Sequence, residues 1–216
     1  MNRSESAKRA AKNADPDPVL ARLVDTGALV NLAGNYDYLS EGYYLSQDYE
    51  NSGHAIRPSC KEMLDAYVPP LLLAKAKLAG VPVPDYYLSN GYFEPPVIVD
   101  PINPFTLKGR VVWKSGRAKS IAKSLTRNFT YAVCCQEIPE GGKIAYFRSV
   151  LGWAVQPRFR ELSRIVWEVF GVPLARVRAV RSKNNQLLLS DISPLFMEDL
   201  GVREADYLKE RVAWDS

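Results

Sequence analysis

The chain has 216 residues and a formal net charge of +4, with 47% hydrophobic and 24% charged residues. This balance is typical of a globular protein with a sizeable core, and no apolar run approaches the roughly 20 residues that a membrane-spanning helix needs. Three cysteines, two of them adjacent, argue against a disulfide framework, and a single histidine without a Cys-x-x-Cys pair argues against a zinc site. We therefore expect a reducing, cytoplasmic environment of bacterial type.

Residues 1–18 are basic but have no apolar stretch, so they predict a flexible arm and not a secretory signal. We expect one α/β domain over 19–216. If this domain is divided into two parts, we expect the boundary near 80–96. The first predicted elements are a helix over 18–28, a strand over 27–33, a helix over 41–52 capped by Ser40, a strand over 54–59, and helices over 60–67 and 70–80. This order predicts a βαβ unit over a parallel sheet.

The second half begins with a proline-rich, aromatic connector over 81–96. The elements expected after it are strands over 97–100 and 110–115, a helix over 116–128, a hairpin of 131–138 with 143–153, a helix over 157–171, a hairpin of 174–180 with 186–192, and a helix over 203–214. In the second hairpin, Arg176 and Arg178 are expected to alternate outward. The predicted fold class is α/β, with a Rossmann-like βαβ first half followed by a mixed α+β second half with two hairpins.

One stretch carries a distinctive pattern: a strand ending in Asn-Leu, a tyrosine-rich loop, then Leu-Ser, Gly-Tyr-Tyr, Gly-His and Pro-Ser. These features fall on Asn31, Leu32, Tyr36, Tyr38, Leu39, Ser40, Gly42, Tyr43, Tyr44, Gly53, His54, Pro58 and Ser59. The stretch resembles the start of the N-terminal domain that precedes RimK-like ATP-grasp ligases. A second likeness to that family is the helix, Pro-Leu and strand of residues 162–180.

The resemblance implies association with ligases that use ATP to form amide bonds to amino acids or peptides. Such a ligase needs basic residues for the ATP phosphates and a late acidic-plus-asparagine cluster for magnesium. The residues after Cys135 are too few for that module and contain no Glu-x-Asn motif, and residues 116–120 lack P-loop spacing. We therefore expect that the chain is a stand-alone relative of this family without the ATP-grasp module. Its expected role is that of a non-catalytic accessory or substrate-recognition subunit. ATP and magnesium are expected only on the partner ligase.

No catalytic constellation is visible. Glu137, Glu161, Asp191 and Glu198 are isolated carboxylates, so no general acid and base pair is predicted. Cys134 and Cys135 lie in an apolar strand and are expected to be structural. We expect no catalytic or metal-binding residue and no turnover by this chain alone.

The tyrosine-rich loop is the first candidate site. Ligands of open α/β sheets bind at the carboxyl ends of strands, and a helix N-terminus favours an anion such as a carboxylate. The candidate residues for binding a substrate or partner are Asn35, Tyr36, Asp37, Tyr38, Ser40, Gly42 and Tyr43. The alternative is packing, in which the rings hold the helix on the sheet with their hydroxyls at the rim.

A basic helix is the second candidate site, because residues 101–136 contain no acidic residue. The candidate anion or partner face consists of Arg117, Lys119, Lys123 and Arg127, the last three at i, i+4 and i+8. The alternative is a solvated face. A nucleic-acid-associated protein that uses residues 108–127 and the N-terminal arm is the second functional hypothesis, although Trp113 and Phe129 are the only aromatic residues we expect beside this face.

Overall fold

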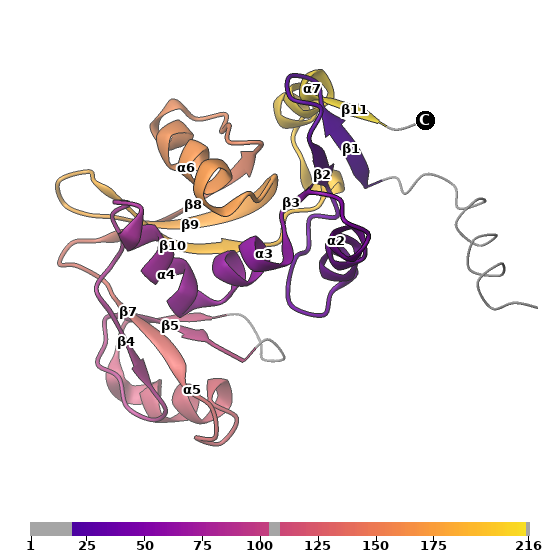
Figure 1. The fold of residues 1–216 in the computed structure, drawn as a ribbon. Coiled ribbons are helices and arrows are strands. Elements are labelled where there is room, and N and C mark those ends of the chain that lie inside the picture. Colours follow the sequence, from indigo (N-terminus) through magenta and orange to yellow (C-terminus); the bar gives the residue numbers. More distant parts are fainter. Residues whose placement is uncertain (1–18, 104–108, 215–216) are drawn as a thin grey trace, which may run out of the picture.

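The structure is a computed structural model that describes residues 19–103 and 109–214. The expected arm over 1–18, together with Lys108, lies outside the described residues. Within them the chain forms three sheets, whose strand orders are β11-β1-β2-β3, β10-β9-β8 and β4-β7-β5-β6. We name these sheets A, C and B respectively. Figure 1 shows sheet A with α2 and α7 at one end of the molecule and sheet B with α5 at the other.

Sheet A consists of β1 (Leu20–Leu23), β2 (Leu29–Asn31), β3 (Ile56–Arg57) and β11 (Val212–Trp214). Sheet B consists of β4 (Tyr86–Ser89), β5 (Val97–Pro101), β6 (Arg110–Val112) and β7 (Val133–Glu137). Sheet C consists of β8 (Lys143–Val150), β9 (Leu174–Arg181) and β10 (Leu187–Ser193).

The helices are α2 (Glu41–Asn51), α3 (Cys60–Tyr67), α4 (Pro69–Leu78), α5 (Ala118–Leu125), α6 (Arg160–Phe170) and α7 (Val202–Arg211), with short 3₁₀ turns η1 (Ser115–Arg117), η2 (Pro157–Phe159) and η3 (Met197–Asp199).

Sheet C is the centre of the fold because both of its faces are covered. Alternate residues of a strand point to opposite faces. On one face Ala175, Val177 and Ala179 join the core formed with α3, α4 and α6. On the other face Val180 packs against Ile98 of sheet B. The far face of sheet B is covered by α5, through a core that includes Val99, Cys135 and Leu125 among its members. The layers are therefore α5, sheet B, sheet C, and the helices α3, α4 and α6.

The expected βαβ unit is confirmed, because β2 and β3 pair in parallel and α2 lies between them in the sequence. The expected parallel sheet is wrong, because β1 pairs antiparallel with both β2 and β11. Ser40 caps α2 by accepting a hydrogen bond from the Tyr43 amide at 3.2 Å. Ser59 and Glu62 form a capping box at the start of α3. The hairpin of β9 with β10 is also confirmed. The α/β fold class is thus correct.

Four local predictions are wrong. Residues 20–23 form strand β1 and not a helix, because they pair with both β2 and β11. The connector over 81–96 contains β4. The helix expected over 203–214 ends at Arg211 and continues as β11. The hairpin predicted across 139–142 does not form, because β7 pairs with β4 and β5 in sheet B while β8 pairs with β9 in sheet C.

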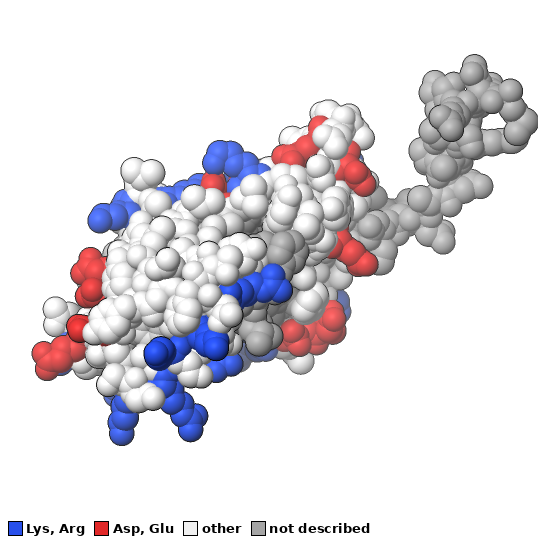
Figure 2. Space-filling view, turned by 90° about the horizontal axis from the view of Figure 1, so that it is seen from below, with Lys and Arg blue, Asp and Glu red and all other residues white. Residues whose placement is uncertain are grey.

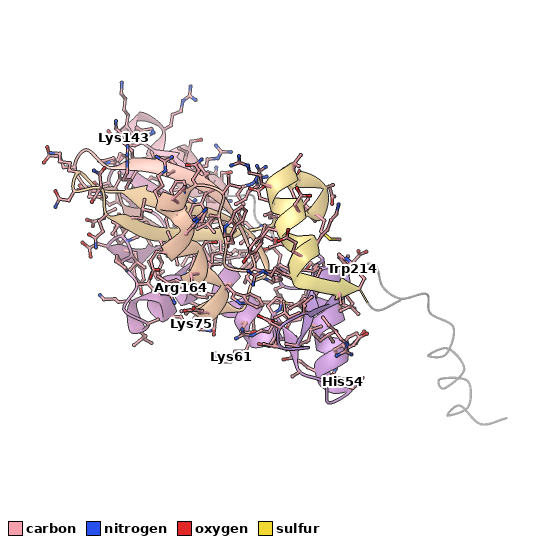
Figure 3. The ribbon with its side chains drawn as sticks, turned by 90° about the horizontal axis from the view of Figure 1, so that it is seen from above. His54, Lys61, Lys75, Lys143, Arg164 and Trp214 are labelled. Atoms are coloured by element: carbon pink, nitrogen blue, oxygen red, sulfur yellow. The ribbon has the colours of Figure 1, made fainter. Side chains whose placement is uncertain are left out.

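The two ends of the molecule are marked by labelled side chains in Figure 3. Lys143, at the start of β8, lies far from His54, which follows α2, and from Trp214 of β11. Sheet A therefore caps one end of sheet C. Its inner face forms a core with Leu174 at the start of β9 and Leu208 of α7. No helix in the described parts of the chain is both long and apolar enough to cross a membrane.

Candidate functional site

A cavity of about 880 Å³ lies where all three sheets approach one another. Its polar lining comes from the tyrosine-rich loop, the corner between α3 and α4, the end of β5, and strands β8, β9 and β10. The polar residues that line it are Asp37, Tyr38, Tyr67, Asp100, Asn103, Tyr146, Arg176, Arg178, Asp191 and Ser193. The cavity thus presents carboxylates, guanidinium groups, phenols and an amide in one space.

A buried polar network closes the side of the cavity between sheets B and C. Arg178 donates from Nη2 to Oδ2 of Asp100 at 2.6 Å and from Nε to Oγ of Ser190 at 2.9 Å. Gln136 donates to the same Asp100 oxygen at 2.7 Å and accepts from the Ser190 hydroxyl at 2.8 Å. Arg178 is 5% exposed and Asp100 is 4% exposed. The expectation that Arg178 points to solvent is wrong, because the outer face of β9 is covered by sheet B.

Asp191 is the second carboxylate that acts on Arg178. Burial alone would lower the pKa of the Arg178 guanidinium, but the charges of Asp191 and Asp100 raise it above its usual range. A bulge in β10 between Leu189 and Asp191 allows both Ser190 and Asp191 to face the cavity side. Asp191 is therefore not isolated in the fold, although the sequence offered no neighbour for it.

Tyr67 places a phenol at the corner between α3 and α4. Its hydroxyl is buried and has no hydrogen-bond partner among the described residues. Burial raises the pKa of this phenol well above its usual value, and the nearby Tyr36, Asp37 and Asp191 raise it further. The Tyr67 hydroxyl is thus a buried donor in the same region of the cavity as two carboxylates.

Some of the site residues predicted in the tyrosine-rich loop line the cavity, and others are buried in the core. Asp37 and Tyr38 line the cavity. Tyr36 is fully buried, and its hydroxyl donates to the Asn31 carbonyl at 2.8 Å. Burial raises the pKa of the Tyr36 phenol. Tyr43 is also buried and meets the ring of Tyr38 edge-on, with 5.2 Å between centroids. The ring of Tyr38 is therefore held against the helix that follows the loop.

The other predicted residues of the loop set its shape. The Asn35 side chain accepts from the Asp37 amide at 3.1 Å, and the Asn35 carbonyl accepts from the Ser40 hydroxyl at 3.1 Å. Gly42 is required by close packing, because a Cβ there would lie 2.2 Å from the Asn35 carbonyl oxygen. The space beside Gly42 that we expected to admit a ligand is filled by the chain itself.

The predicted basic face lies on the outer layer, away from sheet C. Arg117, Lys119, Lys123 and Arg127 are all exposed on η1, α5 and the turn after α5. All four lie on the segment of η1, α5 and the following turn, but Arg117 lines one hollow beside α5 and Lys119 lines another. Sheet B separates this segment from the cavity. The nucleic-acid hypothesis for this face stays a prediction.

The cavity residues do not fit the magnesium cluster that the resemblance implies. Strand β10 ends in Asp191, Ile192 and Ser193, a carboxylate and a hydroxyl at i and i+2, in place of Glu-x-Asn. The guanidinium of Arg178 already interacts with Asp191 and Asp100, and a fixed positive charge opposes a divalent cation. No group of three or more metal-ligating His, Cys, Asp or Glu side chains occurs within 19–103 and 109–214.

Sequence reasoning missed Asp100, Arg178 and Ser193 as site residues. Asp100 and Arg178 are 78 positions apart and belong to different sheets, so no local pattern links them. The available signal was polar residues at the ends of apolar strands: Asp100 follows Val97–Val99, and Asp191 and Ser193 close β10. Strand ends are where α/β folds commonly place binding groups.

No protein-family model matches the chain, and no curated protein sequence matches it. Solved structures do match. The ATP-grasp ligase PsnB, complexed with minimal precursor, Mg and ADP, is 14% identical with a TM-score of 0.52, over 78% of this chain and 66% of that chain. The RimK domain protein ATP-grasp from Sphaerobacter thermophilus is 15% identical with a TM-score of 0.58, over 79% of this chain and 76% of that chain.

D-alanine–D-alanine ligase from Bacillus anthracis, complexed with ATP, is 12% identical with a TM-score of 0.56, over 77% of this chain and 69% of that chain. This chain spans just under two thirds of the PsnB chain. A likeness over more than three quarters of this chain extends far beyond residues 31–59, so it is not confined to an N-terminal domain. At these identities the comparison establishes the fold: the chain has an ATP-grasp-like α/β fold.

Proposed function

We propose that this protein is a non-catalytic accessory or substrate-recognition subunit that works with an ATP-grasp ligase on amino acids or peptides. The observation that carries the proposal is the buried Arg178, which interacts with Asp100 and Asp191 inside the cavity of an ATP-grasp-like fold. ATP and magnesium then belong to a partner ligase chain. Three free cysteines favour a reducing, cytoplasmic location for the pair.

The mixed charge of the cavity supports amino acids or peptides as the ligand class. A free amino acid or a dipeptide presents an ammonium group and a carboxylate a short distance apart. Asp37 and Asp191 are acceptors for the ammonium group near Tyr67. Arg176, which also pairs with Asp199 at 3.8 Å, is a donor for the carboxylate. Charge-assisted hydrogen bonds of this kind are stronger than neutral ones.

Binding of a simple probe tests the recognition role. Alanylalanine is titrated into the full chain by calorimetry, and Asp191→Asn and Arg176→Gln are each expected to weaken binding about tenfold, as loss of a charged hydrogen bond does. Asp206→Asn, an exposed carboxylate on α7, is the matched control and should leave binding unchanged. Equal binding by all four proteins would refute the assignment of the cavity.

Activity measurements test the non-catalytic role. The full chain is purified from the organism that encodes it together with any bound ligase, and amide formation is compared with and without the chain. We expect a captured ATP-grasp ligase whose amide-forming turnover rises when the chain is added. Release of ADP together with amide formation by the isolated chain, lost in Asp191→Asn, would overturn the proposal.

A further inference from the structure

A second hollow, a groove of about 800 Å³, runs between the edge of sheet B and the beginning of α5. Its walls are Arg110, Val112, Trp113 and Lys114 of β6 and the segment after it, and Arg117 and Ile121 of η1 and α5. The groove thus has a strand on one side and a helix on the other, with cationic and apolar side chains on both.

The strand side of the groove offers backbone hydrogen bonds. Sheet B has the order β4-β7-β5-β6, and β6 pairs with β5 and with no other strand in the described part of the chain. The outer edge of Arg110–Val112 therefore has N–H and C=O groups that pair with no strand of residues 19–103 and 109–214. Such an edge pairs with an added strand, and a groove between an edge strand and a helix is a common peptide-binding arrangement.

Positive charge lies on both sides of the groove, because Arg110 and Lys114 line its strand side and Arg117 lines its helix side. We name these three residues, together with Lys119, Lys123 and Arg127 farther along the same segment and outside the lining of the groove, the basic face. All six are exposed, and none forms an ion pair with a residue that the structure describes. Figure 2 looks onto the α5 side of the molecule and shows basic groups gathered in its centre and lower part, with acidic groups at the margins.

Exposed aromatic rings supply apolar contact beside the charges. The Trp113 side chain is 55% exposed at the groove. On the other side of the helix start, Tyr92 is 72% exposed and lines a hollow of about 750 Å³ together with Phe129 and Lys119. Large exposed aromatic residues are typical of interaction surfaces.

We propose that the groove between β6 and α5 binds an extended acidic polypeptide segment, which adds to β6 as a strand and pairs its carboxylates with Arg110, Lys114 and Arg117, the cations that line the groove. The free strand edge favours a polypeptide over a nucleic acid, because backbone pairing at a sheet edge uses peptide N–H and C=O groups. This proposal is independent of the ligand of the cavity, since sheet B separates the cavity from α5.

The test uses the full chain and a fluorescein-labelled peptide of alternating Glu and Val, followed by fluorescence anisotropy. A peptide of alternating Gln and Val and a single-stranded oligodeoxythymidine are the two comparison probes. We expect saturable binding of the Glu peptide that weakens with salt. We also expect slower amide hydrogen exchange over 110–112 in the complex, because strand addition protects the N–H groups of the edge.

Two triple variants with the same change in net charge separate the basic face from overall charge. Arg110→Gln, Lys114→Gln and Arg117→Gln together should weaken binding of the Glu peptide about tenfold, or about 1.4 kcal/mol. The control variant carries Lys77→Gln, Arg203→Gln and Lys209→Gln, which remove exposed cations from α4 and α7. It should change the affinity for the Glu peptide less than about twofold.

The proposal is overturned by any of three results: no binding of the Glu peptide, equal loss of binding in both triple variants, or unchanged exchange over 110–112 in the complex. Tighter binding of oligodeoxythymidine than of the Glu peptide, with loss in the first triple variant, would instead identify the basic face as a nucleic-acid surface. None of these results bears on alanylalanine binding in the cavity.

Discussion

Replacing Arg178 with methionine removes the charge at the centre of the buried network while keeping an extended side chain. Both side chains of the Arg178–Asp100 pair are nearly inaccessible, at 6% and 5% exposure, and the pair is 2.6 Å long. Removing one partner of a buried ion pair leaves an uncompensated charge and costs about 3–5 kcal/mol. We expect the free energy of unfolding of Arg178→Met to fall by that amount, measured by urea unfolding with tryptophan fluorescence at pH 7.

The double variant Arg178→Met with Asp100→Asn is the control. With both charges removed, the remaining amide can still accept from Gln136, so we expect it to recover at least half of the loss. The reasoning is refuted if Arg178→Met costs less than about 1 kcal/mol, the value of an exposed pair, or if the double variant is no more stable than the single one.

Three further predictions concern other buried groups. Tyr67→Phe removes an unpartnered hydroxyl and should leave urea stability unchanged, whereas Tyr36→Phe removes a bonded one and should cost about 1 kcal/mol. Gly171→Ala, at φ 67° with a Cβ 2.5 Å from a carboxyl of α3, should lower Tm by more than Gly53→Ala, at φ 80° in open space. Burial raises the pKa of Asp65, but two lysines lower it below its usual value, so wild type should lose more stability than Asp65→Asn as pH falls through about 4. If wild type and Asp65→Asn lose stability equally steeply as the pH falls, the prediction for Asp65 is contradicted.

Local signals in the sequence predicted most helices and several strands correctly. Ser40 was correctly predicted as a helix cap because the capping bond lies within three residues of the cap. The equivalent cap by Ser59 was not predicted. Gly171 was correctly predicted as the end of α6, since its left-handed conformation suits glycine. The alternation of β9 was also visible, but no local pattern indicates which face of the strand is covered.

Long-range pairing accounts for the failures. Residues 20–23 become a strand because β11, at the other end of the chain, pairs with them, and no local preference reports such a partner. The turn over 139–142 has the composition of a hairpin, yet its two strands join different sheets. Because the chain passes from sheet B to sheet C at this point, Asp100 of sheet B covers Arg178, and a buried charge of the candidate site was therefore expected on the surface.

The passage of the chain from sheet B to sheet C also determines how sheet B is attached to the rest of the fold. Residues 86–137 form β4 to β7 and α5 as one uninterrupted stretch, and its two ends meet where the Glu137 amide donates to the Asp85 carbonyl at 2.8 Å. A segment that enters and leaves at neighbouring points can be enlarged or exchanged without any change in the connectivity of sheets A and C. Its complete removal is a different matter, because Arg178 and Val180 would lose Asp100 and Ile98 as partners.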